Sequence, residues 1–293
     1  MKKIILSAIV FVGAMTLNAQ DEAPKLSISG TVDAYYQTYL TASDDVSGSF
    51  GTSFADEAGF ALGMANLVLS YDGEKTGVVA DLVYGPRGDS AAGGYNLNQL
   101  YAYWNVSEST TLTAGRFNTY LGYEVISPAG NFNYSTSYLF SSGPFSHVGL
   151  KADFALSEDF SLMLAVMNPT DTNNNTTGDY GFGAQLGYAG QYLNLYYDND
   201  SVLGFEIDYT GGFDLSESFF LGINGAYQVS DDAGFYGAAL YPQLTTSDSF
   251  SIGLRGELFG LHAKDVDDLP SVFATTLTGS YTVENLTIKP EVR

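Results

Sequence analysis

Polar and apolar residues alternate along most of this chain. Residues 148–154 read VGLKADF and residues 250–258 read FSIGLRGEL, so apolar side chains keep one parity and polar side chains the other. A period of two residues predicts β-strands with two chemically different faces. No stretch of comparable length keeps the 3.6-residue period of an amphipathic helix. The sequence therefore predicts an all-β protein.

The alternation predicts fifteen strands. They are expected at 26–40, 60–72, 77–85, 96–106, 111–118, 145–156, 160–168, 180–188, 192–198, 204–213, 219–229, 234–243, 249–261, 272–283 and 286–293. Most have a length close to the roughly 9 to 11 residues with which a tilted strand crosses a bilayer.

The connections between these strands alternate in length. Those at 41–59, 86–95, 119–144 and 169–179 are long and rich in Gly, Ser, Asn and Asp, whereas those at 73–76, 107–110, 157–159 and 189–191 are short. Tight turns at one end and long loops at the other are typical of outer-membrane barrels. We therefore expect a transmembrane, antiparallel, up-and-down β-barrel.

The number of strands indicates which face points outward. About eight strands close a barrel that side chains can fill, whereas fifteen or sixteen leave an aqueous lumen. The polar face should then line water and the apolar face should meet lipid. The predicted pore-lining residues are Arg116, His147, Lys151, Asp153, Glu206, Asp208, Arg255 and Glu257. Among them Arg116 shares the parity of apolar Leu112 and Ala114, which indicates a β-bulge.

Composition narrows the alternatives. Hydrophobic residues make up 45% of the chain and aromatic residues 14%, which excludes a disordered chain. A soluble exported sandwich is the competing structure, but its exposed faces should carry more charge than the 15% of charged residues found here. Asp and Glu outnumber Lys and Arg by 33 to 11, so nucleic acid is not an expected partner. The chain has no Cys, which excludes disulfides and thiolate-bound metals.

The N-terminus reads as an export signal. Lys2 and Lys3 precede an apolar run from Ile4 to Met15, and Ala19 supplies a small residue at a cleavage-type end. We expect a signal peptide over 1–19, cleaved near Ala19, and a barrel domain over 20–293 in the bacterial outer membrane.

Residues 115–171 resemble the OmpL-like outer-membrane β-barrel porin family. The resemblance rests on GRF at 115–117, LGYE at 121–124, NYSTSY at 133–138, GPFSHVGLK at 143–151 and MNPTD at 167–171. It implies an outer-membrane channel of unassigned substrate, with no catalytic residues to carry over.

The C-terminus departs from this family pattern. Such barrels end in a strand with a terminal aromatic residue, whereas this chain ends at Pro290-Glu-Val-Arg293. Fifteen is also an odd number, and single-chain bacterial barrels are normally even. We expect a barrel that lacks its last strand, of sixteen in the full-length protein, with a seam between residues 26–40 and 286–293; a miscounted strand is the alternative.

The sequence offers little for catalysis or metal binding. Neither His147 nor His262 has a Ser and carboxylate nearby in the sequence that would indicate a nucleophilic arrangement. The acidic runs at 44–45, 231–232 and 265–268 lack the pattern of an EF-hand, so they are interpreted as solvated loops. No enzymatic activity, cofactor or metal is expected.

The connection at 119–144 is the longest and holds many rings. We expect it to fold into the lumen as a constriction formed by Tyr120, Tyr123, Glu124, Phe132, Tyr134 and Tyr138. The alternative is an ordinary cap above the membrane.

The predicted function is passive diffusion of small hydrophilic solutes or ions, with the lipid bilayer as the other partner. A non-conducting surface barrel remains the alternative, and a monomer and a homo-oligomer are both left open.

Overall fold

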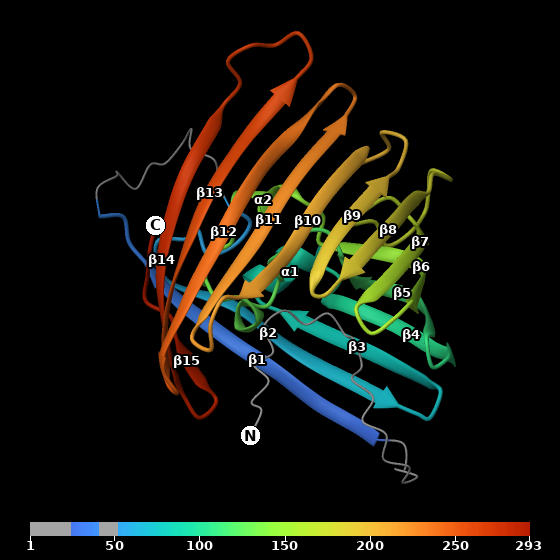
Figure 1. Ribbon diagram of the computed structural model, residues 1–293, viewed down its shortest axis with the longest axis horizontal. Helices are drawn as coiled ribbons and strands as arrows, with labels where there is room; N and C mark the ends of the chain where they lie inside the picture. Colours follow the sequence, from blue (N-terminus) through green and yellow to red (C-terminus); the bar gives the residue numbers. More distant parts are fainter. Residues whose placement is uncertain (1–24, 41–51) are drawn as a thin grey trace.

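Each strand of the protein pairs with the next one along the chain, except that the last short strand pairs with the strand two places before it. The structure, a computed structural model, describes residues 25–40 and 52–293, so the expected signal peptide and the acidic pair at 44–45 lie outside the described residues. The strands form one antiparallel sheet in chain order (Figure 1). They are β1 (Lys25–Gln37), β2 (Gly59–Asp72), β3 (Thr76–Tyr84), β4 (Leu97–Ser107), β5 (Thr110–Asn118), β6 (Ser146–Ala155), β7 (Phe160–Met167), β8 (Gly181–Tyr188), β9 (Gln191–Tyr197), β10 (Phe205–Asp214), β11 (Phe219–Ser230), β12 (Ala233–Ser247), β13 (Phe250–Ala263), β14 (Ser271–Val283), β15 (Leu286–Ile288) and β16 (Glu291–Val292).

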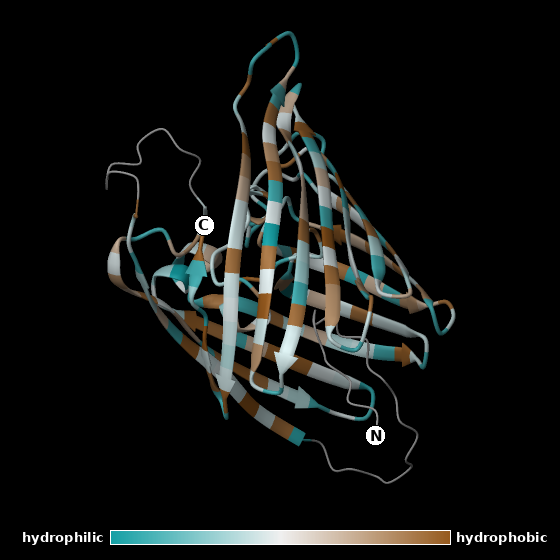
Figure 2. Ribbon diagram, turned by 60° about the vertical axis from the view of Figure 1, so that its left-hand side comes forward, coloured by the Kyte–Doolittle hydropathy of each residue, from teal (hydrophilic) through white to brown (hydrophobic). Residues whose placement is uncertain are grey.

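The predicted alternation sorts side chains to the two faces of the sheet. In the registers of β6 with β5 and β7, Leu150 lies opposite Ala114 and Val166, whereas Lys151 lies opposite Thr113 and Ala165. Leu150 and Val166 are 52% and 49% exposed, and they lie on the outer face of the sheet. Figure 2 shows the resulting bands of hydrophobic and hydrophilic residues along the strands. The fold is thus the up-and-down arrangement expected from the sequence.

Serine residues shape three of the short turns. The hydroxyls of Ser157, Ser216 and Ser247 each accept a hydrogen bond from the backbone N–H three residues later, at 3.1, 3.0 and 3.1 Å. A hydroxyl that bonds its own backbone in this way stabilises the reversal of the chain. The residue that follows each turn is a phenylalanine, Phe160, Phe219 or Phe250, so the repeat places rings at one end of the sheet.

The opposite end carries the long connections and the helices. These are α1 (Pro86–Ala92), the 3-10 turn η1 (Pro128–Gly130) and α2 (Tyr138–Ser142). Figure 1 shows α1 and α2 on the concave side of the curved sheet, between its two walls. Within residues 25–40 and 52–293, no helix has both the length and the apolar character needed to cross a membrane.

The sheet is open at a seam between its first and last strands. Among the described residues, β1 pairs with β2 alone, and β15 and β16 both pair with β14. The last expected strand, 286–293, is therefore two short strands rather than one. Pro290 lies between them and has no N–H to donate, which interrupts the ladder.

Candidate functional site: the interior of the sheet

The connection from β5 to β6 lies on the concave side of the sheet. It leaves and returns at one place, because the backbone N–H of Thr119 donates to the carbonyl of Phe145 at 3.0 Å. Between these residues the chain crosses the interior and contacts strands on the far wall. We call residues 119–145 the inner segment.

The first turn of the inner segment is bound to β9 and β10. The hydroxyl of Tyr120 donates to the carbonyl of Leu195 at 2.6 Å. The backbone N–H of Gly122 donates to Oδ1 of Asp208 at 3.0 Å. Burial raises the pKa of the Tyr120 hydroxyl above its ordinary value.

The middle of the inner segment contacts both sides of the seam. The hydroxyl of Tyr134 donates to Oδ2 of Asp33 on β1 at 2.6 Å, and its backbone N–H donates to Oε2 of Glu291 on β16 at 2.8 Å. The amide of Asn133 donates to the hydroxyl of Thr278 on β14 at 2.7 Å. Burial, with a contribution from the hydrogen bond to Asp33, raises the pKa of Tyr134. The inner segment therefore bridges strands that do not pair with each other.

Glycines on the inner wall make room for rings of the inner segment. A Cβ atom added at Gly222 would overlap the ring of Tyr123, and one added at Gly253 would overlap the ring of Phe132. Tyr123 also stacks on Tyr241, with ring centroids 4.3 Å apart. The segment is thus packed against β11, β12 and β13 and not merely suspended between the walls.

A buried ion pair joins the inner segment to β13. The guanidinium of Arg255 lies 2.7 Å from the carboxylate of Glu124, and these side chains are 1% and 3% exposed. Arg255 also donates to the carbonyl of Ser135 at 2.6 Å, and Glu124 accepts from the backbone N–H of Ser137 at 2.6 Å. Such additional hydrogen bonds are what a buried ion pair needs to offset its desolvation.

Glu257 and Tyr138 lie beside this ion pair. Glu257 accepts from the backbone N–H of Leu139 at 2.9 Å and lies 3.7 Å from the guanidinium of Arg293. The same guanidinium lies 4.3 Å from the ring centre of Tyr138, whose ring also packs near Phe259 at 5.9 Å. Of the predicted pore-lining residues, Arg255 and Glu257 are therefore covered by the inner segment.

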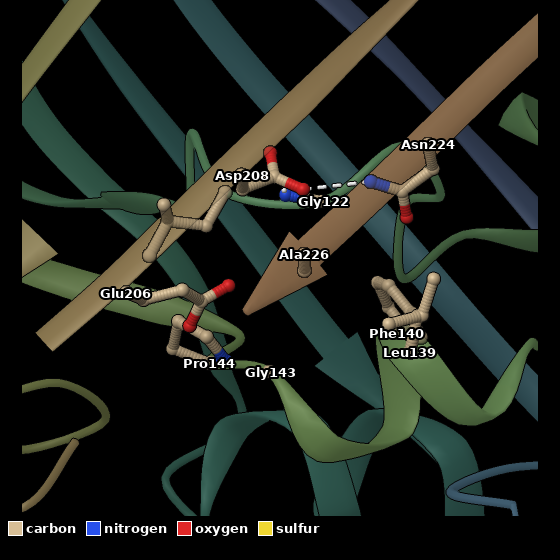
Figure 3. A pocket seen from close by; sticks show the side chains of 10 residues that line it. Gly122, Leu139, Phe140, Gly143, Pro144, Glu206, Asp208, Asn224 and Ala226 are labelled. Carbon is tan, nitrogen blue, oxygen red and sulfur yellow. Dashed lines mark hydrogen bonds between the residues drawn. The ribbon is translucent and has the colours of Figure 1, made fainter. Parts of the chain in front are cut away.

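Glu206 and Asp208 lie on β10 beneath the first turn of the inner segment (Figure 3). Asp208 accepts from the side chains of Asn194 and Asn224 at 2.6 and 2.7 Å. Glu206 is 2% exposed, and its Oε2 has no hydrogen-bond partner in the part of the chain that the structure describes. The cavity that they line has room for about one water molecule, about 10 Å³.

His147 is also sealed from solvent. Its Nε2 lies 2.9 Å from the hydroxyl of Thr119, and its ring packs between those of Tyr120 and Tyr196, at 5.2 and 5.7 Å between centroids. Its exposure is 0%. The residue therefore belongs to the packed inner wall.

Lys151 and Asp153 keep contact with solvent. The ammonium of Lys151 lies 2.6 Å from Oδ2 of Asp153, with side-chain exposures of 25% and 41%. The same ammonium lies 5.8 Å from the ring centre of Phe117. This pair is on β6, across from the wall that the inner segment covers.

The β-bulge expected at Arg116 is not present, because β5 pairs with β4 and with β6 through Arg116 without a shift of register. Gly115 adopts φ 134°, and both Arg116 and Phe117 after it are buried, so the alternation breaks there. Nε of Arg116 donates to the carbonyl of Asn98 at 3.0 Å. The side chain thus points to the protein interior at the end of the sheet that carries the long connections.

The family model described as "Putative beta-barrel porin-2, OmpL-like" matches residues 25–293. The chain belongs to this OmpL-like porin family. The match extends from β1 to the last residue, well beyond the stretch at 115–171 that resembles the family by motif.

Several solved structures, among them mutants of a bacterial porin, share the fold of this chain. A structure described as "Asymmetric conductivity of engineered proteins" has a TM-score of 0.53 at 13% identity, over 91% of this chain and 93% of its own. Two mutants of the porin of Rh. blastica each have a TM-score of 0.52, at 13% and 14% identity and with the same coverage. At such identities the likeness concerns the fold alone. No curated protein matches the chain in sequence.

Several interior residues of the protein were not singled out by the sequence. Asn194 and Asn224 bind Asp208, and Arg87 of α1 packs over the ring of Phe54 at 4.7 Å. The two asparagines have the parity of the inward face of their strands, and this was the feature of the sequence that could have predicted their position. No group of three or more His, Asp or Glu side chains is placed to hold a metal ion within 25–40 and 52–293.

Proposed function

We propose that the protein forms a water-filled channel in the outer membrane for passive diffusion of small hydrophilic solutes or ions. The observation that carries this proposal is the sorting of the faces, with charged residues such as Lys151 and Asp153 inside and large apolar residues such as Leu150 outside. The outer face suits lipid, because a charged side chain at the bilayer midplane costs about 2 to 4 kcal/mol. Family membership and fold support a channel over an enzyme.

The passage is proposed to run along β6. Lys151 and Asp153 line it, since their side chains remain in contact with solvent. Arg116 lies at its entrance. The inner segment narrows it from the opposite wall. The buried His147, Asp208, Arg255 and Glu257 hold that segment in place, and Glu206 is buried beside Asp208. Selection is then geometric and electrostatic, as in other pores lined by charged side chains.

Single-channel recording with cysteine variants tests this proposal. The natural chain has no Cys, so Asp153→Cys introduces the single reactive thiol. A positively charged, water-soluble thiol reagent should change the conductance of Asp153→Cys in planar bilayers. The matched control is Leu150→Cys, three residues away on the outer face, whose conductance should stay constant. Absence of any steady current would contradict the proposal and favour a non-conducting surface barrel.

A further inference from the structure

A second, larger cavity lies where the long connections meet. It measures about 560 Å³ and is bordered by the end of α1, the connection 168–180, and Arg116 and Phe145. We call it the rim pocket. Its volume falls in the range of about 300 to 1,000 Å³ in which proteins hold small molecules.

The protein itself engages the one cationic group of the rim pocket. Arg116 is 6% exposed, and it donates to the carbonyls of Asn98 and Ala91 at 3.0 and 3.4 Å and to the side chain of Asn173. A guanidinium binds carboxylates and phosphates strongly when its paired N–H groups are free to meet them. Arg116 therefore offers little to an anionic ligand.

The one carboxylate of the rim pocket is also in use. Asp171 accepts hydrogen bonds from the backbone N–H groups of Phe145 and Ser146 at 3.0 and 2.8 Å. It shares the pocket with Arg116, so the two formal charges cancel. The pocket is thus close to neutral in a chain whose formal charge is −22.

Apart from Asp171, which is itself exposed, the solvent-facing polar groups of the pocket are uncharged. Ser90, Asn174 and Thr176 are exposed, and hydroxyl and amide groups both donate and accept hydrogen bonds. Tyr95 adds a ring that is 63% exposed. A sugar has the matching chemistry, since its hydroxyls donate and accept and its ring carries apolar C–H faces that can lie on an aromatic ring.

We propose that the rim pocket binds neutral polyhydroxylated solutes, such as mono- and disaccharides, at the entrance of the channel. Binding in the pocket does not depend on the proposed function, but passage of the bound solute through the channel rests on it. A zwitterionic solute is the competing occupant, and it would need the two charged groups that the protein already uses.

Calorimetric titration of the full chain in detergent with maltose tests the pocket. Saturable binding is expected, and Tyr95→Ala should weaken it about fivefold or more, the effect of truncating a central aromatic residue of an interface. Asn174→Ala should weaken it too. The matched control is Tyr180→Ala, because Tyr180 is similarly exposed, at 54%, in the connection 168–180 but does not line the pocket.

The outcomes separate this inference from the proposed function. Absence of saturable maltose binding would overturn the inference, as would tighter binding of the zwitterion glycylglycine or equal effects of Tyr95→Ala and Tyr180→Ala. Maltose binding that depends on Tyr95 would support it even if no current were recorded, which would contradict the channel alone.

Discussion

The hydroxyl of Tyr134 donates a 2.6 Å hydrogen bond to Asp33, which joins the inner segment to β1 across the concave side of the sheet. The backbone of the same tyrosine is bound to Glu291 of β16, so one residue connects both edges of the open seam. Both contacts are accepted by side-chain carboxylates, and neither belongs to a β-ladder. The first and last strands are therefore held near each other from inside the sheet.

Tyr134→Phe should lower the free energy of unfolding by about 1.5 to 3 kcal/mol, the contribution of a hydrogen bond to a charged group. The ring would remain and the hydroxyl donor to Asp33 would be lost. Denaturant unfolding of the protein in detergent measures the change. Tyr197→Phe is the control, since its hydroxyl bonds exposed Asn199 and its loss should cost no more than about 0.5 kcal/mol. Equal effects of the two variants would contradict the prediction.

Arg255→Met should cost about 3 to 5 kcal/mol, because it leaves the carboxylate of Glu124 buried without its partner. The double variant Arg255→Met with Glu124→Leu should recover much of that loss, since neither charge of this pair is then left buried without the other. The surface pair of Lys264 and Asp232, 3.3 Å apart and well exposed, is the comparison. Lys264→Ala should change stability by no more than about 1 kcal/mol. A double variant no more stable than Arg255→Met would contradict this reasoning.

Two glycines of β13 should respond differently to an added methyl group. Gly253→Ala would overlap the ring of Phe132, which must move, and such overpacking costs about 1 to 3 kcal/mol. Gly256→Ala meets no atom within 4 Å, so it should have little effect. If the inner segment narrows the passage, Gly253→Ala should also alter single-channel conductance and its noise. Identical thermal midpoints and identical currents for both variants would refute the prediction.

The proposed channel should prefer cations at low salt, because the chain carries a formal charge of −22. The preference should weaken as the Debye length falls from about 30 Å at 0.01 M salt to about 10 Å at 0.1 M. Reversal potentials under a salt gradient measure it, and Asp153→Asn should reduce it. Anion preference at low salt would mean that Arg116 and Lys151 outweigh the acidic loops.

The strands could be predicted because the alternation that defines them is local. In residues 250–258 the polarity of each side chain predicts which face of the sheet it occupies, and β13 includes that stretch. The unusual parity of Arg116 was visible for the same reason, but the β-bulge predicted from it was wrong. The helix α1 was not expected, because its seven residues are too few to show a helical period. Pro86 at its start and Gly93 in the left-handed conformation after its end were the available signals.

The partners of the inner segment could not be predicted. Its many rings indicated an inward fold, but the contacts of Glu124 with Arg255 and of Tyr134 with Glu291 span 131 and 157 residues of sequence. No local pattern in the sequence indicates which of these distant residues will be in contact. The distinction between residues that keep solvent contact, such as Asp153, and residues that the segment covers, such as Glu257, depends on those distant pairings.

These long separations also bear on the order of assembly. The inner segment is made before β13, β14 and β16, yet Glu257, Thr278 and Glu291, which bind it, are carried by those strands. A nascent sheet that has formed as far as β12 has the segment but lacks these anchors. The first turn of the inner segment can already bind β9, β10 and β12 at that stage. The middle of the segment should consequently dock later, after the C-terminal strands have joined the sheet.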